Sequence, residues 1–98
     1  MFKFKRRSQI ISQTIKILPD VLSQEVSSET VLLDLKSERY FGLNDIGTRI
    51  WQLLQLHSDF KKIHEIMLDE YDVSSEQLQK DMDKLVTKLV AAGLASIE

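Results

Sequence analysis

The 98-residue sequence contains no cysteine, which excludes disulfide bonds, iron–sulfur clusters, thiolate zinc sites and thiol nucleophiles. It also lacks any apolar run near the roughly 20 residues that span a bilayer, and its N-terminus has no signal-peptide-like apolar region. We therefore expect a cytoplasmic protein without a membrane span. A chain this short buries too little surface to enclose a deep catalytic cavity, so we do not expect an enzyme.

Residues that hold cofactors or metal ions are scarce as well. Gly42, Gly47 and Gly93 lie far apart and form no phosphate-binding loop. We expect Gly42 to serve the turn from a strand into a helix, and Gly47 to allow a close approach of that helix to another element. His57 and His64 lack the spacing of a metal-binding pair, and the acidic pairs are typical of solvated helix faces. We predict no catalytic residue, no metal and no cofactor.

The net charge of −2 conceals an uneven distribution along the chain. Residues 1–7 carry four of the 13 basic residues and no acidic one, so the remaining residues sum to 9 − 15 = −6. A basic terminal arm is most often solvated and flexible, although it can also contact phosphates or anionic lipid. We predict a flexible basic segment over residues 1–12 and a single domain over residues 13–98.

Three strands are predicted after a loose leading segment that contains Pro19. The first covers residues 21–26, and the second covers the alternating pattern of residues 30–36. The third covers "RYFGL", in which Arg39, Phe41 and Leu43 share one face while Tyr40 lies on the other. Together the three strands form an antiparallel sheet.

Three helices follow, each with a recognisable start. Asn44 caps a helix that ends near residue 56, and Ser58 caps a second helix over residues 60–71. Ser74 with Gln77 matches a capping box for a third helix through about residue 92, which Gly93 ends. The last five residues either pair briefly with the sheet or fray. The fold class is α+β, a winged helix-turn-helix in which a three-stranded antiparallel sheet precedes three helices.

A winged helix often binds DNA, with its third helix in the major groove. Here the three lysines of the third helix are cancelled by three acidic residues, and the chain beyond residue 7 is acidic. This balance opposes the counterion release that dominates affinity for nucleic acid. A DNA-binding regulator is therefore kept only as the alternative of a different class, and we expect no nucleic-acid partner.

Two stretches resemble a known family. "ETVLLDLKSERYFGLNDIGTRIWQLL" and "YDVSSEQLQKDMDKLVTKLVAAGLA" are similar to the PqqD family, whose members are stand-alone recognition elements for ribosomally synthesised and post-translationally modified peptides (RiPPs). The similarity runs from about residue 21 to residue 94, and "LLDL", "YFGLN" and "GTRIW" are its most specific parts. Glu38 stands where many relatives have a glycine in the hairpin turn.

The resemblance implies a non-enzymatic adaptor that captures the leader segment of a precursor peptide. In such domains the leader adds as an antiparallel strand along the third strand and lies against the third helix, and flanking pockets select its side chains. The implied contact residues are the edge positions Glu38, Arg39, Tyr40, Phe41 and Leu43 and the helix positions Leu78, Asp81, Met82 and Leu85. Whether Tyr40 or Phe41 faces the peptide is left open.

Within the family, the short independent chain and its central block look most like members from lasso-peptide gene clusters. This implies delivery of the leader to a separate leader peptidase, and of the precursor to a cyclase. The alternative within the family is a PqqD-type chaperone that serves a radical SAM enzyme in pyrroloquinoline quinone biosynthesis. Gene neighbours distinguish the two.

Overall fold

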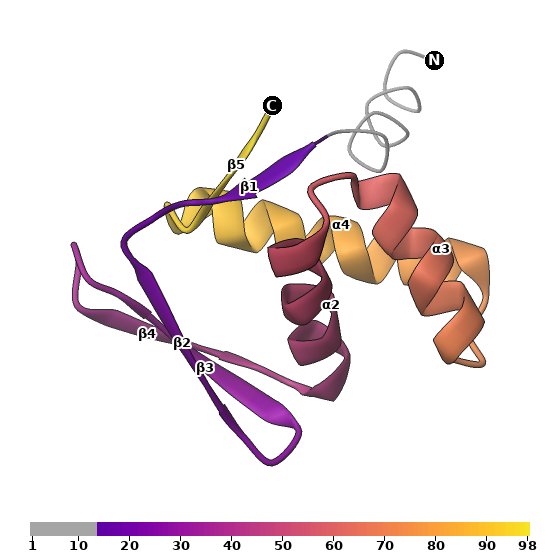
Figure 1. Ribbon diagram of the computed structural model, residues 1–98, viewed down its shortest axis with the longest axis horizontal. Coiled ribbons are helices and arrows are strands. Elements are labelled where there is room, and N and C mark those ends of the chain that lie inside the picture. The colour runs from indigo at the N-terminus through magenta and orange to yellow at the C-terminus, as the bar shows by residue number, and fades with distance from the viewer. Residues whose placement is uncertain (1–13) are drawn as a thin grey trace.

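The computed structural model describes residues 14–98 and confirms the α+β prediction. Figure 1 shows a sheet on one side of three helices, a winged-helix-like arrangement, with a second small sheet near the C-terminus. The predicted flexible basic segment, residues 1–12, lies outside the described residues. In chain order the elements are β1 (Ile15–Ile17), β2 (Val21–Val26), β3 (Glu29–Asp34), β4 (Arg39–Leu43), α2 (Asp45–Leu56), α3 (Phe60–Glu70), α4 (Ser75–Ala91) and β5 (Ala95–Ile97).

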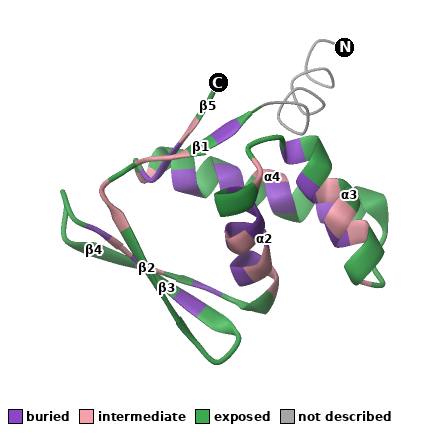
Figure 2. Ribbon diagram, in the orientation of Figure 1, coloured by how far each residue is buried: buried purple, intermediate pink, exposed green. Residues whose placement is uncertain are grey.

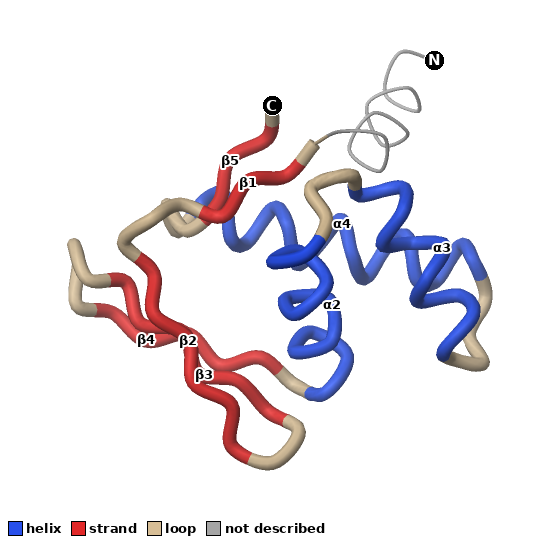
Figure 3. Tube along the Cα trace, viewed as in Figure 1, coloured by secondary structure: helices blue, strands red, loops and turns tan. Residues whose placement is uncertain are grey.

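The main sheet is antiparallel with the strand order β2-β3-β4, so β4 is an edge strand (Figure 3). Its register places Leu32 opposite Phe41 and Val31 opposite Gly42. Alternate residues of β3 are buried, as period-two packing on one face requires, whereas Val31 is exposed on the other face. The sheet therefore has an inner face against the helices and an outer face toward solvent.

The second sheet corrects two expectations about the ends of the domain. Residues 15–17, expected to be loose, form β1, which pairs with β5 in an antiparallel register of Ile15 opposite Ile97. The C-terminal residues thus neither join the main sheet nor fray. Ile15 is buried, and its N–H donates to the carbonyl oxygen of Ser58 at 2.8 Å. Strands of three residues carry too little pattern to be recognised locally, and their pairing depends on contacts between distant parts of the chain.

The helix starts agree with the predicted caps except at one position. The Asn44 side chain accepts from the Gly47 N–H at 2.8 Å, and the Ser74 hydroxyl accepts from the Gln77 N–H. The second helix is capped by Asp59 rather than Ser58. A carboxylate and a hydroxyl are both good caps, so the local sequence could not decide between adjacent residues.

The third helix departs from a full capping box. The Gln77 side chain does not return to the Ser74 N–H but donates to Asp81 Oδ1 at 3.0 Å. At the other end, Gly93 has a φ of +78°, the left-handed conformation predicted for the residue that ends this helix. The box is therefore half formed, and the C-terminal stop is confirmed.

The core lies between the inner face of the sheet and the three helices (Figure 2). Its members share nearly complete burial and come from every layer, including Leu32 of β3, Trp51 of α2, Met67 of α3 and Val86 of α4. At its edge, Arg49 of α2 forms a bidentate ion pair with Glu70 of α3, at 2.7 Å and 2.5 Å. This pair lowers the pKa of Glu70 and joins two helices at the surface.

The two hairpin turns contain residues with left-handed backbone conformations. Ser27 and Glu38 each have a φ of +61°, a region that favours glycine. The turn at Glu38 is held by Asp34, whose carboxylate accepts from the Ser37 hydroxyl at 2.8 Å and from the Lys36 N–H at 3.0 Å. These bonds lower the pKa of Asp34. Glu38, where the resemblance leads one to expect a glycine, thus has a left-handed backbone conformation.

Candidate peptide-binding groove

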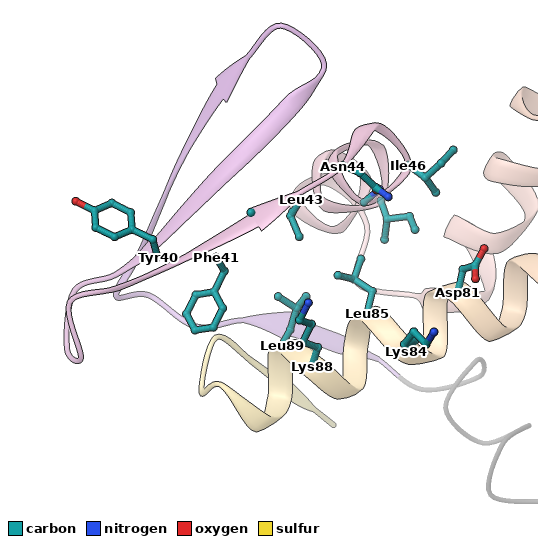
Figure 4. A pocket seen from close by; sticks show the side chains of 13 residues that line it. Tyr40, Phe41, Leu43, Asn44, Ile46, Asp81, Lys84, Leu85, Lys88 and Leu89 are labelled. Carbon is teal, nitrogen blue, oxygen red and sulfur yellow. The ribbon is translucent and has the colours of Figure 1, made fainter.

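A groove of about 650 Å³ runs between β4 and α4 and reaches the start of α2 (Figure 4). One wall is the edge strand, the other is a helix, and the turn into α2 closes the gap between them. The lining residues are Tyr40, Phe41, Gly42, Leu43, Asn44, Ile46, Gly47, Ile50, Asp81, Lys84, Leu85, Lys88 and Leu89. The groove therefore combines the edge of β4 that does not pair with β3 with an apolar surface between β4 and α4.

The strand wall offers both backbone and side-chain contacts. Because β4 pairs with β3 on one side only, backbone groups on its other side have no strand partner among residues 14–98. Phe41 is half-buried and its ring points toward α4, whereas Tyr40 is 72 % exposed and points away from the helix (Figure 4). The Arg39 guanidinium lies 5.7 Å from the centre of the Phe41 ring, a cation–π distance.

The turn from β4 into α2 closes the groove, and side chains of this turn pack closely against Gly47. A Cβ on Gly47 would lie 3.2 Å from Oδ1 of Asn44, the N-cap of the same helix, and 3.4 Å from Cβ of Leu43, at the end of β4. The close approach predicted for Gly47 is therefore to the preceding turn and strand end. Gly42 lies within β4 itself rather than in the turn, which corrects its expected role. A Cβ there would meet nothing within 4 Å, so position 42 leaves open space beside the strand edge.

The helix wall combines apolar residues with charged ones. Leu89 is buried and Leu85 is partly buried, and both face the groove. Lys84 and Lys88 are exposed and also line it. Asp81 lies nearer the start of the helix and accepts a hydrogen bond from the Gln77 side chain.

Five predicted contact residues meet at this groove, and four lie elsewhere. Leu78 and Met82 are 2 % and 0 % exposed and belong to the core, so the structure corrects their placement on the groove wall. Glu38 precedes β4 and lies in the turn, and Arg39 touches the groove only through the Phe41 ring. The predicted residues that line the groove are Tyr40, Phe41, Leu43, Asp81 and Leu85. That these residues contact a peptide stays a prediction.

Sequence reasoning missed three residues of α4, namely Lys84, Lys88 and Leu89. The signal that could have found one of them is helical spacing, because Leu85 is predicted to face the groove and Leu89 follows it by four residues. Lys84 and Lys88 border the same face one residue earlier. Long lysine side chains lie along apolar surface while their ammonium groups stay in water, and this places them on the rim.

The described residues show no arrangement typical of catalysis at this groove. Residues 14–98 contain no group of three or more histidine, aspartate or glutamate side chains that could hold a metal ion. The lowered pKa values of Asp34 and Glu70 arise from hydrogen bonds outside the groove. Within the same range, no helix is both long enough and apolar enough to cross a membrane.

Comparisons with known proteins agree with this geometry. The chain is similar to a solved structure described as "TbiB1 in Complex with the TbiA(beta) Leader Peptide", with 32% identity and a TM-score of 0.78, covering 83% of this chain and 94% of that one. It is also similar to "Lasso peptide synthetase B1 complexed with the leader peptide", with 30% identity and a TM-score of 0.73, covering 85% and 98%. A comparison with curated protein sequences finds no match. The model of the family described as coenzyme PQQ synthesis protein D (PqqD) matches residues 29–95, and the chain belongs to this family.

Proposed function

We propose that this chain is a non-enzymatic adaptor that binds the leader segment of a precursor peptide, as the RiPP recognition elements among its relatives do. The observation that carries the proposal is the groove along the free edge of β4, with Phe41 and Leu85 on its two walls. Two relatives of at least 30% identity were solved with a leader peptide bound.

The physical basis of binding is strand addition. An extended peptide beside β4 satisfies backbone N–H and C=O groups that otherwise face water, which gives affinity without regard to sequence. Its alternate side chains then point toward α4, where Phe41, Leu43 and Leu85 offer apolar contacts. Burial of two or three apolar side chains at about 1 kcal/mol or more each is enough to select a leader over an arbitrary extended segment.

The finer part of the proposal is delivery to separate enzymes, a leader peptidase and a cyclase in lasso-peptide maturation. The outer face of the main sheet supports a second contact, because it carries three exposed apolar side chains that do not line the groove: Leu22, Val26 and Val31. This face lies opposite the helices, so a partner enzyme there leaves the groove free. A radical SAM partner, as in pyrroloquinoline quinone synthesis, is the alternative within the family, and the adjacent genes discriminate between them.

Titration of the isotope-labelled chain with the leader segment of its co-encoded precursor tests peptide binding. We expect amide shifts and slowed hydrogen exchange at residues 39–43, with side-chain methyl shifts at Leu85 and Leu89. Shifts centred on β2 or α3 would contradict the docking site. Turnover of the precursor by this chain alone would contradict the non-enzymatic role.

A proline on the strand edge provides a second test with a matched control. The register directs the N–H of Phe41 toward β3 and the N–H of Gly42 toward the free side of β4. Gly42→Pro therefore removes a backbone donor from the free side of β4, whereas Ser23→Pro removes one from the free side of β2, the opposite edge of the same sheet. We expect Gly42→Pro to abolish binding and Ser23→Pro to preserve it. A folded Gly42→Pro variant that binds normally would refute strand addition at β4.

A further inference from the structure

The groove has an uneven charge distribution along the α4 wall. Lys84 and Lys88 are one helical turn apart, both are exposed and both line the groove. Neither lysine forms an ion pair with any residue between 14 and 98. Like charges at this spacing destabilise a helix, so the free protein gains no stability from the pair.

The opposite end of the groove carries negative charge. Asp81 lies one turn before Leu85, and the Gln77 side chain engages its Oδ1 atom only. Arg39 lies 5.7 Å from the centre of the Phe41 ring but does not line the groove. Asn44, at the Asp81 end, is neutral and already engaged as a helix cap. The groove therefore runs from an acidic end to a basic end.

The chain directions of β4 and α4 determine how a guest strand is oriented relative to these charges. Along the groove, Phe41 lies on the side of Lys88 and Leu89, while Asn44 and Ile46 lie on the side of Asp81 (Figure 4). The strand β4 and the helix α4 thus run in opposite directions. A guest strand antiparallel to β4 then runs in the same direction as α4, and its C-terminal half passes Lys84 and Lys88.

We propose that the groove selects leader segments that carry an aspartate or glutamate in the C-terminal half of the bound strand, where it pairs with Lys84 and Lys88. This inference rests on the proposed peptide binding and specifies, in addition, which charge the bound peptide carries and where. Lys88 lies in the last turn of α4, where a basic residue also offsets the helix dipole. Lys84 lies a turn earlier, beyond the reach of that effect, so the dipole does not account for both residues.

A displayed library of random 14-residue peptides, selected against the full chain, tests the proposal. The variant Lys84→Glu/Lys88→Glu reverses the rim charge, and Lys61→Glu/Lys62→Glu makes the same change on exposed residues of α3 that do not line the groove. We expect the wild type and the control to enrich acidic residues on the C-terminal side of the apolar anchors. We expect the rim variant to lose this preference and to enrich lysine or arginine there.

Affinity measurements on one enriched peptide sharpen the outcome. Replacing its glutamate by glutamine should weaken binding to the wild type and to the control by about 2- to 5-fold, with a smaller effect at high salt. The same replacement should not weaken binding to the rim variant. Peptides that bind β4 without any acidic preference, or with one in their N-terminal half, would overturn the charge inference alone. Enrichment of no peptide, or of peptides that Gly42→Pro binds equally well, would overturn the proposed function together with it.

Discussion

The helix α4 presents two faces, and single alanine substitutions should separate them. Leu85 is partly buried and lines the groove, whereas Leu78 is 2 % exposed and belongs to the core. Val90, on the same helix, is 37 % exposed and does not line the groove, so Val90→Ala is a matched control. We expect Leu85→Ala to weaken peptide binding and Leu78→Ala to weaken folding.

The magnitudes follow from the burial of each side chain. Full burial of a leucine contributes about 1.5–3 kcal/mol, and because Leu85 is already partly covered, the peptide adds about 1 kcal/mol of that. Leu85→Ala should therefore raise the Kd about fivefold and lower the free energy of unfolding by about 1 kcal/mol. Leu78→Ala removes a fully buried side chain and should lower the free energy of unfolding by about 2–5 kcal/mol.

Two measurements on each variant decide the result. Fluorescence anisotropy with a labelled leader peptide gives the Kd, and urea denaturation gives the free energy of unfolding, with Val90→Ala unchanged in both within about 0.5 kcal/mol. The reasoning is refuted if Leu85→Ala binds as tightly as the wild type. It is also refuted if a folded Leu78→Ala variant loses as much affinity as Leu85→Ala does.

Two further predictions concern stability. Ser27 has a φ of +61°, which glycine adopts without strain, so Ser27→Gly should raise the free energy of unfolding by about 1 kcal/mol and the Tm by roughly 4–8 °C. The control Ser28→Gly, in the same turn, should lower both quantities. A lower Tm in Ser27→Gly would contradict the proposed strain. Arg49 lowers the pKa of Glu70 below its usual 4.5, so their contact stabilises the fold above that pH and is lost as the pH falls through the lowered pKa. Glu70→Gln should accordingly be less stable than the wild type at pH 7 and converge with it toward pH 3, and a pH-independent difference in denaturation would contradict an ionic origin.

Local chemistry in the sequence determined most of the elements. Asn44 and Ser74 cap the helices that were predicted from them, and Gly93 ends α4 as expected, because caps and left-handed stops act within one turn of the chain. The strands β3 and β4 were predicted from the period-two alternation of their side chains, and β2 from its β-branched residues. The resemblance to a family then identified the edge strand and the facing helix.

Only the tertiary structure decided which side chains of that helix face the groove. Leu78, Met82 and Leu85 lie on one broad apolar arc in the sequence, and the packing of the other elements against α4 buries the first two and leaves Leu85 at the opening. The pairing of β1 with β5 was equally hidden, since it joins segments nearly the whole domain apart. Burial and long-range pairing depend on how all elements pack together, whereas a sequence pattern records only neighbours along the chain.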